Sequence, residues 1–373
     1  MDKNKNWQRK ALYGAAVLLT VLLLSVIFMR NSNPGPVATE GVANLDLMGH
    51  FDMKMNNAIS NALDGILSIK KQYWLDDDTV VAPEPDQSKF GTTQDASTLG
   101  WLLEDAAELL EGQETYFTTQ TKNIPGTQIT YYLDDTILAI TWKETINNMT
   151  YTISEVKIAD PSQFRRFLAG GEYGSSMQLT VSEMATSVNA VVASSADFYK
   201  FRRAGIIVYD ETVMRFEGRQ LDTCYINADG DMLFSHRDEL KSEAEAKRFV
   251  EENRIRFSFA FGPILIEDGK RCEPSYYPIG EIDGEYSRAG IGQKDKLHYM
   301  IATVNHEFGG KVPSIFNFAS GVERFGCDKF YTLDGGQTAT LVMNDRVINH
   351  VDYGNQRKIS DILYFATAIP DGQ

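Results

Sequence analysis

The stretch KFYTLDGGQTATLVM, residues 329–343, joins two apolar runs across a short polar segment. Strand-forming residues lead into Asp334, Gly335 and Gly336, and a second apolar run begins at Leu341. A carboxylate and two glycines between strands predict either a plain turn or a place where the backbone approaches a ligand closely. In the first interpretation, Asp334 caps the turn and the glycines only supply positive φ angles.

The segments on either side of this stretch predict both strands and helices. Apolar patterns typical of strands lie at 127–144, 149–160, 181–195, 204–216, 257–270 and 296–305. Patterns typical of helices lie at 100–112, 161–171, 241–253 and 313–326. The first two strand segments predict a hairpin or meander. Because strands and helices do not alternate regularly, the sequence predicts an α+β fold, a mixed sheet with packed helices.

Composition limits the classes of partner. The chain has 373 residues and a formal net charge of −15, which argues against a nucleic-acid partner because phosphate backbones need a basic surface. A small anion held by a few arginines remains compatible with this charge. The three cysteines have no paired or zinc-like spacing and predict buried free thiols.

The N-terminus predicts a membrane anchor. Residues 11–29 contain no charged side chain, and Lys3, Lys5, Arg9 and Lys10 precede them. A helix of this length covers about 28 Å, close to the thickness of a bilayer's hydrocarbon core. The basic residues predict a cytoplasmic N-terminus, a single pass through the cell membrane and a main domain outside. A cleaved signal peptide is the alternative, but its apolar core is usually shorter.

Three regions follow from these patterns. Residues 1–30 form the basic tip and the anchor. Residues 31–95 form a linker and an amphipathic helical stalk, whose apolar positions between 45 and 74 have helical spacing. These positions favour a helix that packs on its own domain over a dimerising stalk, because sustained heptads with flanking charges are missing. Residues 96–373 form the main domain, with a core at about 150–370.

Four polar segments interrupt apolar runs in the main domain. Asp197 and Tyr199 precede the predicted strand near 205, and Gly262-Pro263 lies inside another. Arg288 begins a strand segment that ends at Asn305, and the fourth segment contains Asp334. One such segment is usually a turn, whereas four of them with aspartates, arginine and hydroxyls indicate a pocket. The five histidines lack ligand spacing, so no metal ligand is predicted, although a carboxylate cluster can hold a divalent cation.

These segments, taken in order, resemble the phosphodiester glycosidase family. The resemblance rests on ADFY with GIIVY, FGPILIEDGK, SRAGIG with LHYMIATVN, LDGGQTATLVMNDRVIN and RKISDILYF, within about residues 150–370. It implies that Asp197, Arg288 and Asp334 are catalytic. It also implies a set of substrate-binding residues, namely Tyr199, Asn305, Gly335, Gly336 and Thr338.

The chain departs from the family pattern at several positions. This chain has Ser195-Ala196 where the family usually has Asn-Gly, and Ser287 where the family has Pro. Residues 305–307 replace the family's Asp-Gly-Arg, and residues 337–339 replace its Gly-Ser-Ser. Thr338 keeps a hydroxyl. Asn305 replaces an aspartate, and an amide cannot act as a general base. Glu307 replaces an arginine, and a carboxylate repels a phosphate.

The resemblance implies a membrane-anchored, extracytoplasmic hydrolase that cleaves sugar-1-phosphodiester linkages in cell-envelope or exopolysaccharide glycopolymers. A carboxylate would stabilise the oxocarbenium-like transition state, and Arg288 would bind the phosphate with two hydrogen bonds. The glycines after Asp334 would let backbone N–H groups face the anion. The alternative is a non-catalytic relative that binds such a polymer or an envelope protein, which the departures at Asn305 and Glu307 favour.

Overall fold

A computed structural model of the chain describes residues 82–93, 96–106, 109, 128–217, 221–272, 284–306 and 311–368. All of them lie in one compact unit, Lys70–Gln373, whereas the unit Met1–Ile69 contains no described residue. Within the described ranges, no helix is long and apolar enough to cross a membrane. The predicted anchor at 11–29 and the helix at 45–74 lie outside these ranges, so both stay predictions.

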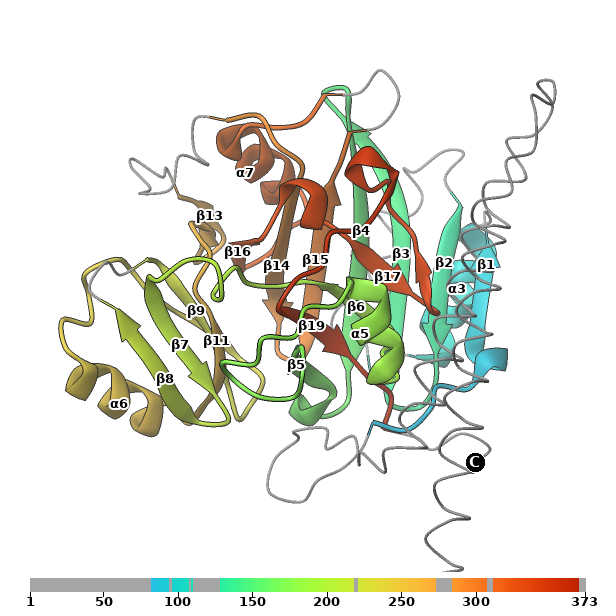
Figure 1. The fold of residues 1–373 in the computed structure, drawn as a ribbon. Helices are drawn as coiled ribbons and strands as arrows, with labels where there is room; N and C mark the ends of the chain where they lie inside the picture. Colours follow the sequence, from blue (N-terminus) through green and yellow to red (C-terminus); the bar gives the residue numbers. More distant parts are fainter. Residues whose placement is uncertain are drawn as a thin grey trace, which may run out of the picture. The chain divides into compact units, whose positions relative to one another are not determined.

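The largest sheet of this unit has nine strands, in the order β1-β2-β3-β4-β15-β14-β16-β12-β13 (Figure 1). Strands β2, β3 and β4 form the predicted meander. In chain order, the nine strands are β1 (Phe90–Thr93), β2 (Ile129–Leu133), β3 (Ile137–Ile146), β4 (Met149–Ile158), β12 (Ile264–Glu267), β13 (Lys270–Arg271), β14 (Arg288–Asp295), β15 (His298–Val304) and β16 (Lys329–Leu333).

A second sheet of five strands has the order β18-β17-β6-β19-β5. Its strands are β5 (Phe164–Leu168), β6 (Val192–Ser195), β17 (Leu341–Met343), β18 (Arg346–Val347) and β19 (Asp361–Phe365). Two small sheets complete the described strands. They consist of β7 (Gly205–Tyr209) with β8 (Thr212–Glu217), and of β9 (Thr223–Asn227), β10 (Met232–Ser235) and β11 (Ile255–Phe259).

The described helices are few and short. Four are α-helices, α3 (Ala96–Asp105), α5 (Val181–Ser187), α6 (Glu243–Glu252) and α7 (Ile315–Glu323). Four are single 3-10 turns, η1 (Gln87–Lys89), η2 (Pro161–Gln163), η3 (Gly336–Thr338) and η4 (Asp352–Gly354). Helices α6 and α7 begin at serine caps that accept a backbone N–H, Ser242 from Glu245 and Ser314 from Asn317. The described part of the chain is therefore built mainly of sheets with a few packed helices, as the predicted α+β class requires.

The core forms because strand residues alternate between two faces. In β3, Leu138, Ile140 and Trp142 belong to the cluster that includes the apolar side of α7. Ile137 and Ala139 point the other way, into the cluster shared with the five-stranded sheet. That second sheet buries its far face against α5. The described unit is therefore layered as helix, nine-stranded sheet, five-stranded sheet and helix.

Three expectations about the elements are wrong. The sheet was expected to be mixed, but every described strand pair is antiparallel. Tight turns require this only of successive strands such as β3 with β4 and β14 with β15. Residues 161–171 were expected to be helical, but only η2 is, because β5 pairs with β19 immediately afterwards. Residues 181–195 were expected to be strand, but only β6 at Val192–Ser195 is, because Thr180 and Glu183 form a capping box that starts α5.

The structure describes residues on both sides of the predicted domain boundary near residue 95, and it describes the three cysteines. Strand β1 lies before that boundary and pairs with β2. The three-part division stays a prediction. All three cysteines are free, with Cys224 and Cys327 buried and Cys272 partly buried.

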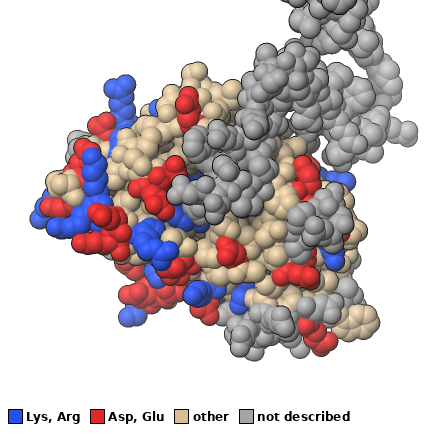
Figure 2. All heavy atoms as spheres, turned by 90° about the horizontal axis from the view of Figure 1, so that it is seen from below, with Lys and Arg blue, Asp and Glu red and all other residues tan. Residues whose placement is uncertain are grey.

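Charged side chains of both signs share the surface. On the face shown in Figure 2, Lys and Arg are interspersed with Asp and Glu over the described part. The expected lack of a nucleic-acid partner stays a prediction from net charge.

Candidate functional site

The turn after β16 carries the chain from one large sheet to the other. β16 ends at Leu333 in the nine-stranded sheet, and β17 begins at Leu341 in the five-stranded sheet. At the start of this crossing, the Asp334 N–H donates to the Ala196 carbonyl at 2.9 Å. The Ser195 hydroxyl donates to the Asp334 carbonyl at 3.2 Å. Asp334 is therefore fixed beside the end of β6.

The two glycines serve different purposes in this turn. A β-carbon on Gly335 would lie 2.5 Å from the Ser287 carbonyl oxygen, so this position has no room for a side chain. Gly336 has open space but a φ of +63°, which favours glycine. Its N–H donates to the Ser287 carbonyl at 2.7 Å, so it is not free to bind an anion as the sequence suggested. The glycines bring the turn against the start of β14.

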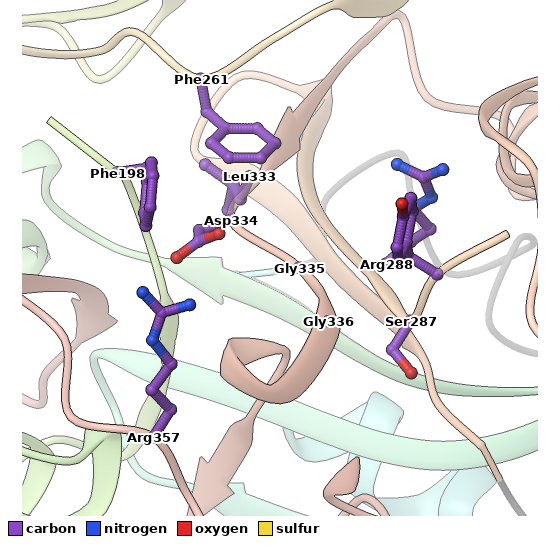
Figure 3. Close-up of a pocket in the computed structure, with 10 residues that line it drawn as sticks. Phe198, Phe261, Ser287, Arg288, Leu333, Asp334, Gly335, Gly336 and Arg357 are labelled. Atoms are coloured by element: carbon purple, nitrogen blue, oxygen red, sulfur yellow. The ribbon is translucent and has the colours of Figure 1, made fainter. Parts of the chain in front are cut away.

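A pocket of about 320 Å³ opens at this junction (Figure 3). Its volume falls within the range of small-molecule sites. Its walls come from five separate parts of the chain, and its lining combines aromatic, cationic and carboxyl side chains with the two glycines. The lining residues are Phe198, Phe261, Tyr286, Ser287, Arg288, Leu333, Asp334, Gly335, Gly336 and Arg357.

The Asp334 carboxyl group is buried in the wall of this pocket. The residue is 7% exposed, and its Oδ2 atom has no hydrogen-bond partner among the described residues. Burial, together with the neighbouring Asp197, raises the pKa of Asp334 to about 7. The Thr338 side chain and the guanidinium groups of Arg357 and Arg202 oppose that increase in pKa. Near neutral pH, this carboxyl group can therefore accept or give a proton.

Two arginines lie on different sides of the pocket. Arg288 is 3% exposed, and its guanidinium donates to the Gly284 carbonyl at 2.6 Å and to the Pro313 carbonyl at 3.4 Å. Arg357 is exposed, and its guanidinium lies over the rings of Phe198 and Phe201. Figure 3 shows the Arg357 side chain directed toward the Asp334 carboxyl group, below Phe198.

Asp197 lies outside the lining of the pocket. It is 1% exposed and accepts the backbone N–H groups of Phe198 at 2.6 Å and Ala260 at 2.7 Å. The guanidinium of Arg166 lies 3.6 Å from Asp197 and 2.7 Å from Asp361. Two carboxylates thus flank one buried arginine, and Asp197 holds in place the chain that carries Phe198.

The remaining predicted residues also lie outside the lining. Tyr199 is buried, stacks on Tyr173 at 5.4 Å and faces Arg166. Burial raises the pKa of its hydroxyl. The Thr338 hydroxyl donates to the Gly335 carbonyl at 2.6 Å and closes the turn.

Asn305 joins a buried amide network. Its Nδ2 donates to the Ala339 carbonyl at 2.9 Å, and its Oδ1 accepts from Asn349 Nδ2 at 2.7 Å. An aspartate here would face the Ala339 carbonyl with a second acceptor, so the amide suits this position. Glu307 lies outside the described residues.

The structure therefore brings Arg288, Asp334, Gly335 and Gly336 to one pocket and leaves the other four predicted residues outside its lining. Sequence reasoning missed Phe198, Phe261 and Arg357 as lining residues. Phe198 and Arg357 stood inside the quoted blocks ADFY and RKISDILYF. No spacing in the sequence signals that they meet, because β6 and β19 position them from distant segments.

The described residues contain no group of three or more His, Cys, Asp or Glu side chains arranged to hold a metal ion. The divalent cation considered from the sequence stays a prediction.

Residues 188–366 match the family model for phosphodiester glycosidases. A curated relative is an uncharacterized protein, YomE, derived from the SPbeta prophage of Bacillus subtilis strain 168. It is 23% identical over 231 residues, which cover 59% of this chain and 34% of the relative. The chain thus matches about a third of the length of that relative.

Two solved structures share the fold. The catalytic domain of zebrafish N-acetylglucosamine-1-phosphodiester alpha-N-acetylglucosaminidase, auto-inhibited by its pro-peptide, aligns with a TM-score of 0.50 and 16% identity. The alignment covers 62% of this chain and 83% of the zebrafish chain. A hypothetical protein from Synechocystis aligns with a TM-score of 0.51 and 12% identity, over 66% of this chain and 64% of its own.

Proposed function

We propose that this protein is a hydrolase of sugar-1-phosphodiesters, because residues 188–366 match the family model for phosphodiester glycosidases. It cleaves the bond between the anomeric carbon and the phosphodiester oxygen. Its substrate is a glycopolymer of the cell envelope or an exopolysaccharide.

One observation carries this proposal. The Asp334 carboxyl group lies in a pocket wall, its Oδ2 lacks a partner among the described residues, and burial brings its pKa to about 7. A carboxyl group that only capped the turn would be expected to accept backbone N–H groups, as Asp197 does. An unpaired, buried carboxyl group facing a cavity is typical of a group that meets a ligand.

The chemistry of the leaving group assigns a role to Asp334. When the bond between the anomeric carbon and oxygen breaks, its electron pair leaves with a phosphate monoester. That anion is a weak base and departs without a proton, so cationic donors serve it better than an acid. Water supplies the new bond to the anomeric carbon, and its proton goes to the ionised Asp334 carboxylate. Asp334 therefore acts as the general base.

A binding protein is the second candidate, and the lining of the pocket favours it. Glycosidases generally use two carboxyl groups, whereas Asp334 is the one carboxylate among the described lining residues. In this candidate, the same pocket binds the sugar phosphate of a polymer without cleaving it.

Turnover by the full-length purified chain distinguishes the two candidates. We expect release of free sugar from a sugar-1-phosphodiester by the native protein, with or without a chelator. The Asp334→Asn variant should lose about 10²–10⁴-fold in rate. Asp135→Asn, a change at an exposed carboxylate, is the control and should retain full rate. Binding of the substrate without any turnover would establish the second candidate.

We also propose that residues 1–30 anchor the protein in the cell membrane, that residues 31–95 form a linker and stalk, and that the main domain lies outside. This topology rests on the uncharged run at 11–29 and the basic residues before it. Protease added to intact cells should then remove the main domain. Complete protection of the domain would contradict this orientation. A mature form that begins near residue 31 would instead establish cleavage.

A further inference from the structure

Two arginines line the pocket, and they differ in their hydrogen bonds. The guanidinium of Arg288 donates to backbone carbonyls, whereas that of Arg357 has no hydrogen bond to a described residue. The Arg288 guanidinium is bound to the carbonyls of Gly284 and Pro313, and its side chain is buried. To turn toward a ligand, it would have to leave those backbone acceptors unsatisfied, which costs free energy. Arg288 therefore holds two chain segments together at the pocket wall.

Arg357 has the opposite environment. It is exposed at the pocket, and the structure gives its guanidinium no hydrogen bond or ion pair with any described residue. Its contacts are with aromatic faces, at 5.4 Å from the Phe198 ring centroid and 5.5 Å from that of Phe201. The two rings stack on each other at 4.9 Å with an interplanar angle of 27°. A guanidinium that contacts ring faces and no hydrogen-bond acceptor keeps its N–H groups available for an anion.

The position of Arg357 relative to Asp334 suits a sugar phosphate. The two side chains line the same pocket, and the Arg357 charge lowers the pKa of Asp334. Figure 3 shows the guanidinium and the carboxyl group directed toward each other below Phe198. A cation for the leaving phosphate and a carboxylate for the attacking water must both lie within reach of the anomeric carbon, because both the bond broken and the bond formed are at that carbon.

The charge of the pocket also differs from that of the chain. The protein carries a formal charge of −15. The pocket combines one described carboxyl group with Arg288 and Arg357, and Arg202 adds its charge nearby through its contact with Phe261. A locally cationic site on an acidic protein selects an anion by local contact rather than by long-range attraction.

We propose that Arg357, held on the Phe198–Phe201 pair, is the residue that binds the phosphate group of the ligand, and that Arg288 is a positioning residue. The ligand class is a sugar carrying a phosphate on its anomeric oxygen. This inference rests on the proposed function for the identity of the ligand, but it concerns binding and does not require turnover.

The test is calorimetric titration of the full-length chain with α-N-acetylglucosamine 1-phosphate and, separately, with N-acetylglucosamine. Arg357→Gln should weaken binding of the phosphate compound by about tenfold or more, as expected for a lost charge-assisted hydrogen bond. Binding of the neutral sugar should stay within about twofold, since only the phosphate contact is lost. Arg357→Lys should give an intermediate loss because lysine keeps the charge but not the fork of donors.

Lys358→Gln is the matched control. It removes the same charge from the next residue, which is exposed and outside the lining, and should leave both affinities within about twofold. Equal losses in Arg357→Gln and Lys358→Gln would overturn the inference, because they would reflect net charge alone. No binding of the phosphate compound by the native protein would also overturn it.

The results separate this inference from the proposed function. Tight, Arg357-dependent binding without turnover of a phosphodiester supports the inference and refutes the hydrolase. Turnover that persists in Arg357→Gln with unchanged affinity supports the hydrolase and refutes the inference. A melting temperature close to that of the native protein should accompany Arg357→Gln, because the side chain is exposed.

Discussion

Gly335 lies so close to Ser287 that a β-carbon on the glycine would be 2.5 Å from the serine carbonyl oxygen. The adjacent Gly336 donates its N–H to that same carbonyl at 2.7 Å. These contacts join the turn after β16 to the start of β14, where Arg288 begins its strand. The shape of the pocket therefore depends on backbone packing between two segments that are distant in the sequence.

Gly335→Ala should separate these two walls. The alanine methyl group meets fixed backbone, so we expect a loss of about 1–3 kcal/mol in the free energy of unfolding. Gly336→Ala is the paired variant. It has open space but a φ of +63°, and should lose about 1 kcal/mol. Denaturant unfolding measures both, and ligand affinity should fall more in Gly335→Ala. Equal, small effects of the two changes would show that the contact with Ser287 does not shape the pocket.

The pH dependence of turnover should report the ionisation of Asp334. A general base acts in its ionised form, so kcat/KM should rise with pH and reach half its maximum near pH 7, the raised pKa of this carboxyl group. The phosphodiester substrate stays an anion throughout this range and does not contribute to the profile.

Arg357→Gln should move that midpoint to higher pH. The Arg357 cation favours the ionised carboxylate and lowers the pKa of Asp334. Removing this cation therefore raises that pKa. Lys358→Gln serves again as the control. A rate that falls as pH rises through 7 would instead identify Asp334 as an acid.

Asp334→Asn and Asp197→Asn should change stability in opposite directions. The pKa of Asp334 is higher in the folded chain than in the unfolded chain, where it is near 3.8. The folded state therefore binds more protons between about pH 4 and 7, and ionising this group destabilises it as pH rises through 7. Asp334→Asn removes that ionisation, so its melting temperature should exceed the native value at pH 8 and approach it at pH 5.

Asp197→Asn should lower the melting temperature. Asp197 accepts two backbone N–H groups and flanks Arg166, and an amide retains only part of that bonding. We expect a loss of about 1–3 kcal/mol. Thermal unfolding of both variants across pH measures the contrast. A lower melting temperature for both at pH 8 would show that Asp334 also has a structural role.

The elements were predictable from the sequence where local pattern decides them. The spacing of Ile315, Phe318 and Val322 predicts α7, and these residues form its buried side. Residues 161–171 show where local pattern fails. Pro161 and the following residues suit a helix, but Arg166 pairs with Asp361, and β5 joins β19. That pairing lies 195 residues away in the sequence, and no local signal reports it.

The candidate site was predictable in part for the same reason. Motif position identified Asp334, Gly335 and Arg288, which do line a pocket. Motif position could not distinguish a carboxylate that faces the cavity, such as Asp334, from one that accepts backbone N–H groups, such as Asp197. It also could not find Arg357, because the rings that hold it belong to the segment after β6.

Asn305→Asp should destabilise the chain even though it restores the family residue. The Asn305 amide donates to the Ala339 carbonyl at 2.9 Å, and an ionised carboxylate in its place would face that oxygen without a proton to donate. The side chain is 4% exposed, so water cannot compensate fully. The new carboxyl group should have a raised pKa, and its cost should appear as pH rises above that pKa. We expect a loss of about 1–3 kcal/mol in the free energy of unfolding at pH 8 and a smaller loss at pH 5, measured by thermal unfolding.

Asn355→Asp is the control. It changes an exposed asparagine and should have little effect on stability at either pH. An Asn305→Asp protein as stable as the native chain at pH 8 would show that the amide network around Ala339 tolerates a carboxylate, and that the departure from the family pattern needs another explanation.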